Sequence, residues 1–138
     1  MRVIKILMIL AGLALPAAAG ELVVKVQGVR NANGFVRGMV FKAADGFPED
    51  HAKAVALAES KAKAGEVILR FKGVEEGQGA IIIIHDENDD KKLKRNIIGI
   101  PREGVGASNW RRNGRPKYRD AVVPVGPGKM VRVLLKYF

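Results

Sequence analysis

Apolar and polar residues alternate with a period of two along several short stretches of the chain. In Glu21–Gln27 and Glu66–Lys72 every second side chain is apolar, and Phe35–Phe41 is a third apolar stretch that follows the turn dipeptide Asn33-Gly34. A period of two is typical of a β-strand with one face in the core and one in solvent. We therefore predict three strands, the second of which contains Gly38, a residue that indicates a bulge or a close approach of the backbone.

The most apolar run outside the N-terminus is Ala80–His85, which contains four consecutive isoleucines. Six residues bounded by glycine and by charge are typical of a central strand that is buried on both faces. Near the C-terminus, Asp120–Val125 and Lys129–Phe138 flank the turn sequence Gly126–Gly128. They predict a hairpin, with Pro124 on an edge strand or at a bulge.

Between residues 43 and 63 the two signals conflict, because the composition favours a helix while the alanines alternate with other residues. We predict one helical turn near Pro48–His51 and a strand over about Ala54–Ala62. About seven short strands result, which predicts an all-β fold, an antiparallel β-sandwich. One long loop, Asp86–Arg119, remains. Its apolar residues predict that it is packed and ordered: Ile97, Ile98, Ile100, Val105 and Trp110.

The N-terminus has the pattern of a secretory signal peptide. Arg2 and Lys5 precede the apolar run Ile6–Leu15, and Ala17–Ala19 supplies small residues for cleavage. We therefore predict a signal peptide over residues 1–19 and a single domain over residues 20–138, exported to the periplasm or the cell exterior. The alternative is an uncleaved N-terminal anchor. No transmembrane segment is expected in the mature chain, because a spanning helix needs about 20 apolar residues.

Composition narrows the possible chemistry. The chain has no cysteine and only two histidines, which excludes disulfides, thiolate chemistry and a multi-histidine zinc site. The formal net charge is +10, and ten basic residues with a single acid lie between Lys91 and Arg119. A concentration of charge of this kind is evidence about partners and not about fold.

Several ordered motifs across the chain resemble the bacterial exported family known as domain of unknown function 2141. The resemblance covers the whole mature chain. It implies a small immunoglobulin-like or transthyretin-like sandwich in the cell envelope, and it implies no known activity. The motifs are Gly28-Val29-Arg30-Asn31 with Gly34, Gly46-Phe47-Pro48, His85-Asp86-Glu87-Asn88, Gly99-Ile100-Pro101 with Glu103, Gly104 and Gly106, Ser108-Asn109, and Pro116 with Tyr118, Asp120 and Ala121.

Many members of that family continue the His-Asp-Glu-Asn motif as a loop that looks like a calcium site. The matching oxygen donors here are Asp86, Asn88 and Asp90, but Lys91 replaces the turn glycine and Lys94 replaces a later acid. Calcium needs about 6–8 oxygen ligands, so a weak divalent-metal module is one hypothesis. The alternative is structural, in which Asp86 and Asn88 bond loop amides. No other cofactor is expected.

His85 lies where the central strand meets the long loop and has two interpretations. As the catalytic residue of a hydrolase it would pair with Asp86 or Glu103 and activate Ser108, although the sequence lacks a nucleophile-elbow motif. We favour a non-enzymatic role, in which His85 hydrogen-bonds the Gly99–Gly106 segment. The residues predicted to organise the long loop are His85, Asp86, Asn88, Gly99, Pro101, Glu103, Gly104, Ser108 and Asn109.

The third candidate is the basic part of the loop, where aromatic residues alternate with cations. This pattern suits phosphate-rich ligands. Export argues against nucleic acid as a physiological partner, which leaves anionic envelope polymers or lipid head groups, because arginine matches phosphate and carboxylate. The alternative is a solvated basic loop. We favour a cell-envelope binding or structural module that uses the basic segment 91–119, with these polyanion-binding residues: Arg111, Arg112, Arg115, Lys117 and Arg119.

Overall fold

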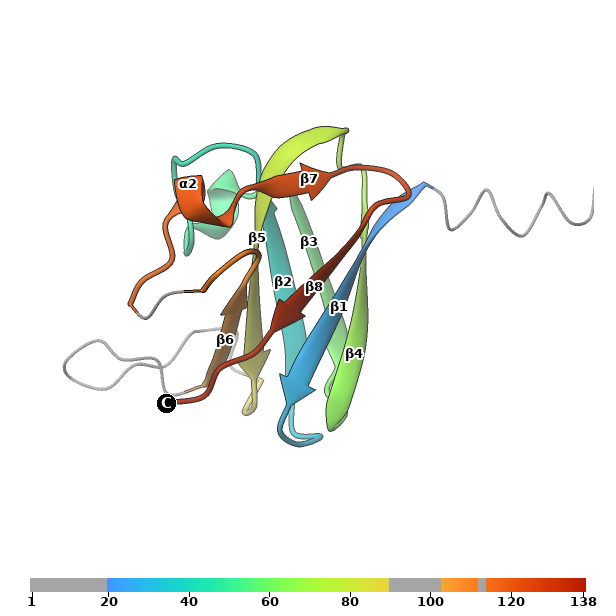
Figure 1. The fold of residues 1–138 in the computed structure, drawn as a ribbon. Helices are drawn as coiled ribbons and strands as arrows, with labels where there is room; N and C mark the ends of the chain where they lie inside the picture. The colour runs from blue at the N-terminus through green and yellow to red at the C-terminus, as the bar shows by residue number, and fades with distance from the viewer. Residues whose placement is uncertain (1–19, 90–102, 112–113) are drawn as a thin grey trace, which may run out of the picture.

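The computed structural model describes residues 20–89, 103–111 and 114–138, which form a mostly β, sandwich-like fold (Figure 1). The predicted signal peptide and the apolar residues 97–100 lie outside the described residues. The three strands predicted by alternation are confirmed. The strands are β1 (Glu21–Val29), β2 (Phe35–Phe41), β3 (Ala56–Lys61), β4 (Gly65–Lys72), β5 (Gly77–Asp86), β6 (Gly104–Ala107), β7 (Val123–Val125) and β8 (Met130–Leu134).

The strands form two sheets. The smaller sheet has the order β4-β1-β8, and the larger has the order β3-β2-β5-β6, with β7 paired to the beginning of β5. The main core lies between them, where Val24 and Phe71 of the small sheet are fully buried with Ile81 and Ile83 of β5. Gly38 makes the predicted close approach, because a Cβ atom there would lie 2.8 Å from the Phe71 ring.

The central strand β5 is apolar on both faces, as predicted. Ile81 and Ile83 face the main core, while Ile82 joins a second apolar cluster with Met39, Phe41 and Ala107. Side chains on opposite faces of a strand cannot share one core, so this second cluster needs its own cover. The strand runs from Gly77 to Asp86, so it begins three residues before the predicted start at Ala80 and ends one residue after His85.

The predicted C-terminal hairpin is wrong. β7 pairs with β5 in the large sheet, whereas β8 pairs with β1 in the small sheet, and the β1–β8 pair is parallel. The turn between β7 and β8 leads the chain from the large sheet to β1 of the small sheet. Its residues bond to β1, since Gly128 N–H donates to Glu21 O and Lys129 O accepts from Val23 N–H. The remaining strand pairs are antiparallel, so the purely antiparallel expectation fails at this one pair.

The long loop contains more regular structure than predicted. It includes β6 and the one-turn helix α2 (Tyr118–Ala121), and Figure 1 shows α2 close to β7. The helical turn expected near Pro48–His51 is the 3₁₀ helix η1 (His51–Lys53), which starts later because the Asp50 side chain accepts a hydrogen bond from Ala52 N–H. No helix in the described parts of the chain is long and apolar enough to cross a membrane.

The C-terminal segment joins the two sheets along one edge. After β8, Lys136 exchanges two backbone hydrogen bonds with Val105 of β6, at 2.9 and 3.0 Å. This approach needs glycine in β6, because a Cβ atom at Gly106 would lie 2.7 Å from both Leu134 O and Val133 Cγ1. A Cβ atom at Gly104 would lie 2.5 Å from the Tyr137 ring.

We predict that Gly106→Ala destabilises the protein by about 1–3 kcal/mol, the range for overpacking a tight interface. The nearest atoms belong partly to backbone, which cannot rotate away. Urea unfolding would measure the change. Leu134→Ala is the control, because its side chain is 59% exposed and its loss should change stability by no more than about 0.5 kcal/mol. Equal stability of Gly106→Ala and the wild type would contradict the close approach.

Candidate functional site

At the end of β5, the fully buried His85 uses both ring nitrogens. Nε2 lies 2.8 Å from Asn33 O, and Nδ1 lies 2.8 Å from the Tyr137 hydroxyl. A carbonyl oxygen can only accept, so Nε2 carries the hydrogen, and the Tyr137 hydroxyl donates to Nδ1 while it accepts from Arg30 N–H. Burial raises the pKa of Tyr137, which keeps this donor protonated at neutral pH. His85 therefore joins the connection between β1 and β2 to the C-terminus. In the described part of the Gly99–Gly106 segment, its partner is Gly104, which its backbone opposes in the β5–β6 pair, and its ring bonds elsewhere.

The residue after Asp86 anchors the same end of the sandwich. Arg30 binds the Glu87 carboxylate with two nitrogens, at 2.6 and 2.8 Å, and Asn31 Nδ2 donates to it at 2.7 Å. These contacts, with Arg30 the largest cause, lower the pKa of Glu87 to about 2. The backbone N–H of Glu87 donates to the buried carboxylate of Glu103 at 3.2 Å, so Glu103 acts where it was predicted, in organising this loop.

In the predicted metal loop, the carboxylates of Asp86 and Asp89 already bind a cationic side chain of the protein, that of Arg37 on β2. Arg37 donates to Asp86 Oδ2 and to Asp89 Oδ1, each at 2.8 Å, and to Glu59 at 3.0 Å. A divalent ion would have to compete with this guanidinium for Asp86. Asn88 is exposed, and Asp90 lies outside the described residues. Among the residues described, no group of three or more His, Cys, Asp or Glu side chains could hold a metal ion.

Ser108 has a structural position. Its hydroxyl donates to Ala121 O at 2.6 Å and accepts from Ile81 N–H at 2.9 Å. Ile81 is four residues before His85 on β5, a separation of about 13 Å at strand spacing. The structure does not bring Ser108 and His85 together, and it gives the hydrolase hypothesis no support. The next residue, Asn109, has a positive φ of 52° and donates to Asp120 O, so both residues fasten α2 to the large sheet.

The second apolar cluster is covered by aromatic residues from two loops. Phe47 meets Phe41 and Tyr118 edge to face, with ring centroids 5.4 and 5.8 Å apart, and Trp110 packs against the same cluster. The Lys136 ammonium lies 4.1 Å from the centre of the Trp110 ring, a cation–π contact. The segment around α2 is therefore held by apolar packing on one side and by the Ser108 hydrogen bonds on the other.

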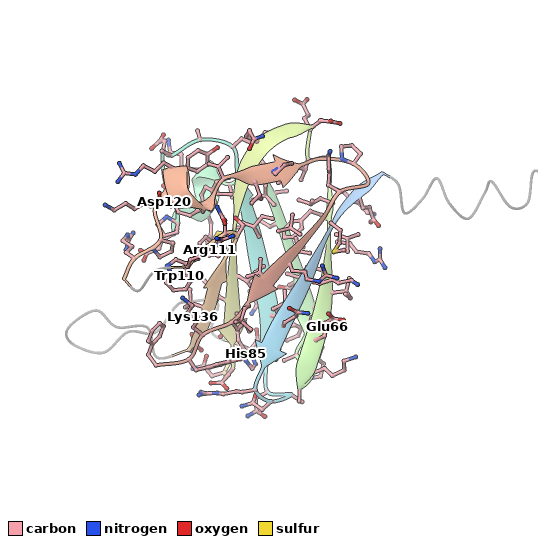
Figure 2. The ribbon with its side chains drawn as sticks, in the orientation of Figure 1. Glu66, His85, Trp110, Arg111, Asp120 and Lys136 are labelled. Atoms are coloured by element: carbon pink, nitrogen blue, oxygen red, sulfur yellow. The ribbon has the colours of Figure 1, made fainter. Side chains whose placement is uncertain are left out.

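Beside this cover lies an open cleft of about 680 Å³. Figure 2 shows Trp110, Arg111 and Asp120 close to α2, whereas His85 lies toward the opposite end of the sandwich. The structure brings together four of the five predicted anion-binding residues, and Arg112 lies outside the described residues. The lining residues are Asn109, Trp110, Arg111, Arg115, Pro116, Lys117, Arg119, Asp120 and Ala121.

Sequence reasoning missed several residues that organise these sites. Arg37 had a weak signal, since it is a lone cation within an apolar strand, and Asp120 was visible as part of the motif Pro116 with Tyr118 and Ala121 but had no role assigned to it. Tyr137 had none, because its role depends on a contact with residues more than 50 positions away. Of the predicted loop-organising residues, Gly104 lies in β6 against Tyr137, and Gly99 and Pro101 lie outside the described residues.

We predict that Glu87→Gln lowers stability by about 1–2 kcal/mol at pH 7, a discounted value because Arg30 is half-exposed. A carboxylate whose folded pKa is depressed stabilises the fold above its unfolded pKa of about 4.5 and loses that effect as pH falls toward 2. The stability difference between wild type and variant should therefore shrink across this interval in urea titrations.

The control for this experiment is Glu66→Gln, at an exposed carboxylate on β4, which should change stability at pH 7 by no more than about 0.5 kcal/mol. A wild-type advantage over Glu87→Gln that stayed constant from pH 7 to pH 2.5 would show that the charge of Glu87 is not its source.

The chain matches the model of a protein family. A model of a family described as uncharacterised proteins conserved in bacteria, DUF2141, matches residues 24–132. No curated protein and no solved structure matches the chain. The matched region extends from β1 to β8 and includes the His85 cluster, Ser108 and the cleft residues. Because the model covers most of the chain, as the motifs predicted, this protein belongs to the DUF2141 family.

Proposed function

We propose that this domain is a non-enzymatic binding module that takes an anionic ligand in the cleft beside α2. The observation that supports this most strongly is the lining of the cleft, in which Arg111, Arg115, Lys117 and Arg119 surround one open space. A volume of about 680 Å³ lies within the usual 300–1,000 Å³ of ligand sites.

The charges in the cleft are presented from a supported position. Trp110 and Tyr118 are packed into the second apolar cluster, and the cations adjacent to them in sequence are exposed. Fixed backbone positions let several cations act on one ligand at a smaller entropic cost than on a free loop. Arginine adds a planar fork that binds phosphate or carboxylate with two hydrogen bonds. Among the described residues, two of these cations have an acidic partner: Arg115 lies 3.1 Å from Glu49, and Arg119 lies 3.8 Å from Asp120.

The setting of this function is also a proposal. The signal-peptide pattern of residues 1–19 supports export to the periplasm or the cell exterior, where anionic envelope polymers or lipid head groups are the available ligands. The two-layer arrangement is compatible with an immunoglobulin-like or transthyretin-like topology. Scaffolds of this class often bind ligands with the loops that join their strands.

We predict that charge reversal of Arg111, Lys117 and Arg119 to Glu abolishes binding to tripolyphosphate, a soluble anion, at low salt. The wild type should bind, and its affinity should fall steeply with salt, because exposed charges are screened over about 10 Å at 0.1 M. Calorimetry would measure both effects. Exposed substitutions of this kind change stability little, so the variant should remain folded.

The matched control is reversal of Lys25, Lys72 and Arg132, which lie on the outward face of the small sheet on β1, β4 and β8. It changes the net charge by the same amount and leaves the cleft intact. If the two triple variants lose binding equally, binding depends on net charge alone and the cleft is not a specific site. Absence of binding by the wild type at low salt would refute the proposal.

A further inference from the structure

Beyond the cations, the cleft contains groups that a simple polyanion would not need. Trp110, Asp120 and Asn109 all line the same space, and their side chains carry an indole, a carboxylate and a carboxamide. A bare phosphate chain has no apolar surface to place on an indole, and it would be repelled by a carboxylate. The composition of the lining therefore distinguishes between classes of anion.

Among the described residues, Asp120 makes one loose ion pair with a cation. Its Oδ1 lies 3.8 Å from Arg119 Nε, its own neighbour in sequence, and its side chain is half-exposed. A carboxylate beside several cations that leaves most of its accepting capacity unused is available to a ligand that donates hydrogen bonds. Hydroxyl groups are such donors, and a hydroxyl–carboxylate hydrogen bond is charge-assisted.

Asn109 and Trp110, which also line the cleft, are each fixed by contacts within the protein. The positive φ of Asn109 and its hydrogen bond to Asp120 O fix the carboxamide at the edge of the cleft. Lys136 lies over the Trp110 ring at 4.1 Å, and the second apolar cluster packs against this residue, so the indole keeps its orientation. An immobile aromatic ring and a fixed amide are typical of sites that position a ring with polar substituents.

On this basis we propose that the ligand of the cleft is an anionic saccharide, in which sugar hydroxyls meet Asp120 and Asn109 while carboxylate or phosphate substituents meet the arginines and lysine. The inference rests on the proposed function, since it assumes that the cleft binds an anion. It adds that the anion is carried on sugar rings, and that charge alone does not give full affinity.

The test uses the full mature protein and three probes: trigalacturonate, which has rings and charge, maltotriose, which has rings alone, and tripolyphosphate, which has charge alone. Trp110 is the only tryptophan in the chain, so its fluorescence reports on the cleft directly. We expect trigalacturonate to change this fluorescence and to bind at least tenfold more tightly than tripolyphosphate at equal ionic strength, with no measurable binding of maltotriose.

The variant Asp120→Asn separates the two classes of anion, because it keeps the shape of the side chain and removes its charge. Binding of trigalacturonate should weaken about fivefold through loss of the charged acceptor, whereas binding of tripolyphosphate should strengthen through loss of repulsion. Opposite signs for the two probes support the proposal, and circular dichroism confirms that the variant is folded.

Two results would overturn the saccharide inference, and only one of them would also overturn the proposed anion-binding function. If tripolyphosphate binds as tightly as trigalacturonate and Asp120→Asn strengthens both, the ligand is a bare anion, and only the saccharide inference fails. If neither probe binds at low salt, the anion-binding function fails with it.

Discussion

The apolar character of both faces of β5 determines much of this structure. Ile81 and Ile83 contribute to the core between the sheets, and Ile82 on the other face cannot reach that core. A buried isoleucine contributes roughly 1.5–3 kcal/mol to the free energy of unfolding relative to an exposed one. Leaving the second face uncovered would therefore remove a large fraction of the stability of a domain of this size. The chain covers it with Phe47, Trp110 and Tyr118. Two of these three residues belong to the basic segment, and their burial decides where its cations lie.

Buried hydrogen bonds at both ends of β5 hold the neighbouring segments in place, in addition to the apolar packing. Ser108 links the backbone of β5 to that of α2 through one buried hydroxyl, which satisfies a main-chain donor of Ile81 and a main-chain acceptor of Ala121. At the other end of β5, His85 and Glu87 connect the turn between β1 and β2 with the C-terminus. The residues with the most catalytic appearance thus have structural partners, whereas the cations beside α2 have exposed side chains.

Strand positions followed from local pattern wherever one face of a strand is buried, as in β1 and β4. The pattern failed where a strand depends on a distant partner. Gly104–Ala107 has neither alternation nor β-branched residues beyond Val105, and it becomes β6 because it pairs with β5, while the C-terminal segment adds a single bridge at Val105. The expected C-terminal hairpin failed for a related reason, since the turn after β7 bonds to β1 across the sandwich. In the same way, the cations of the cleft were visible in the sequence, but the placement of Asp120 among them required the fold.

The central claim is that the cleft beside α2 is a binding site for an anion carried on sugar rings. The most direct measurement is a titration of isotope-labelled protein with trigalacturonate, followed by amide and indole resonances in nuclear magnetic resonance spectra. The account predicts that the largest shifts lie in residues 109–111 and 114–121 and in the Trp110 indole N–H. Shifts centred on the outward face of β1, β4 and β8, with the cleft resonances unchanged, would contradict it.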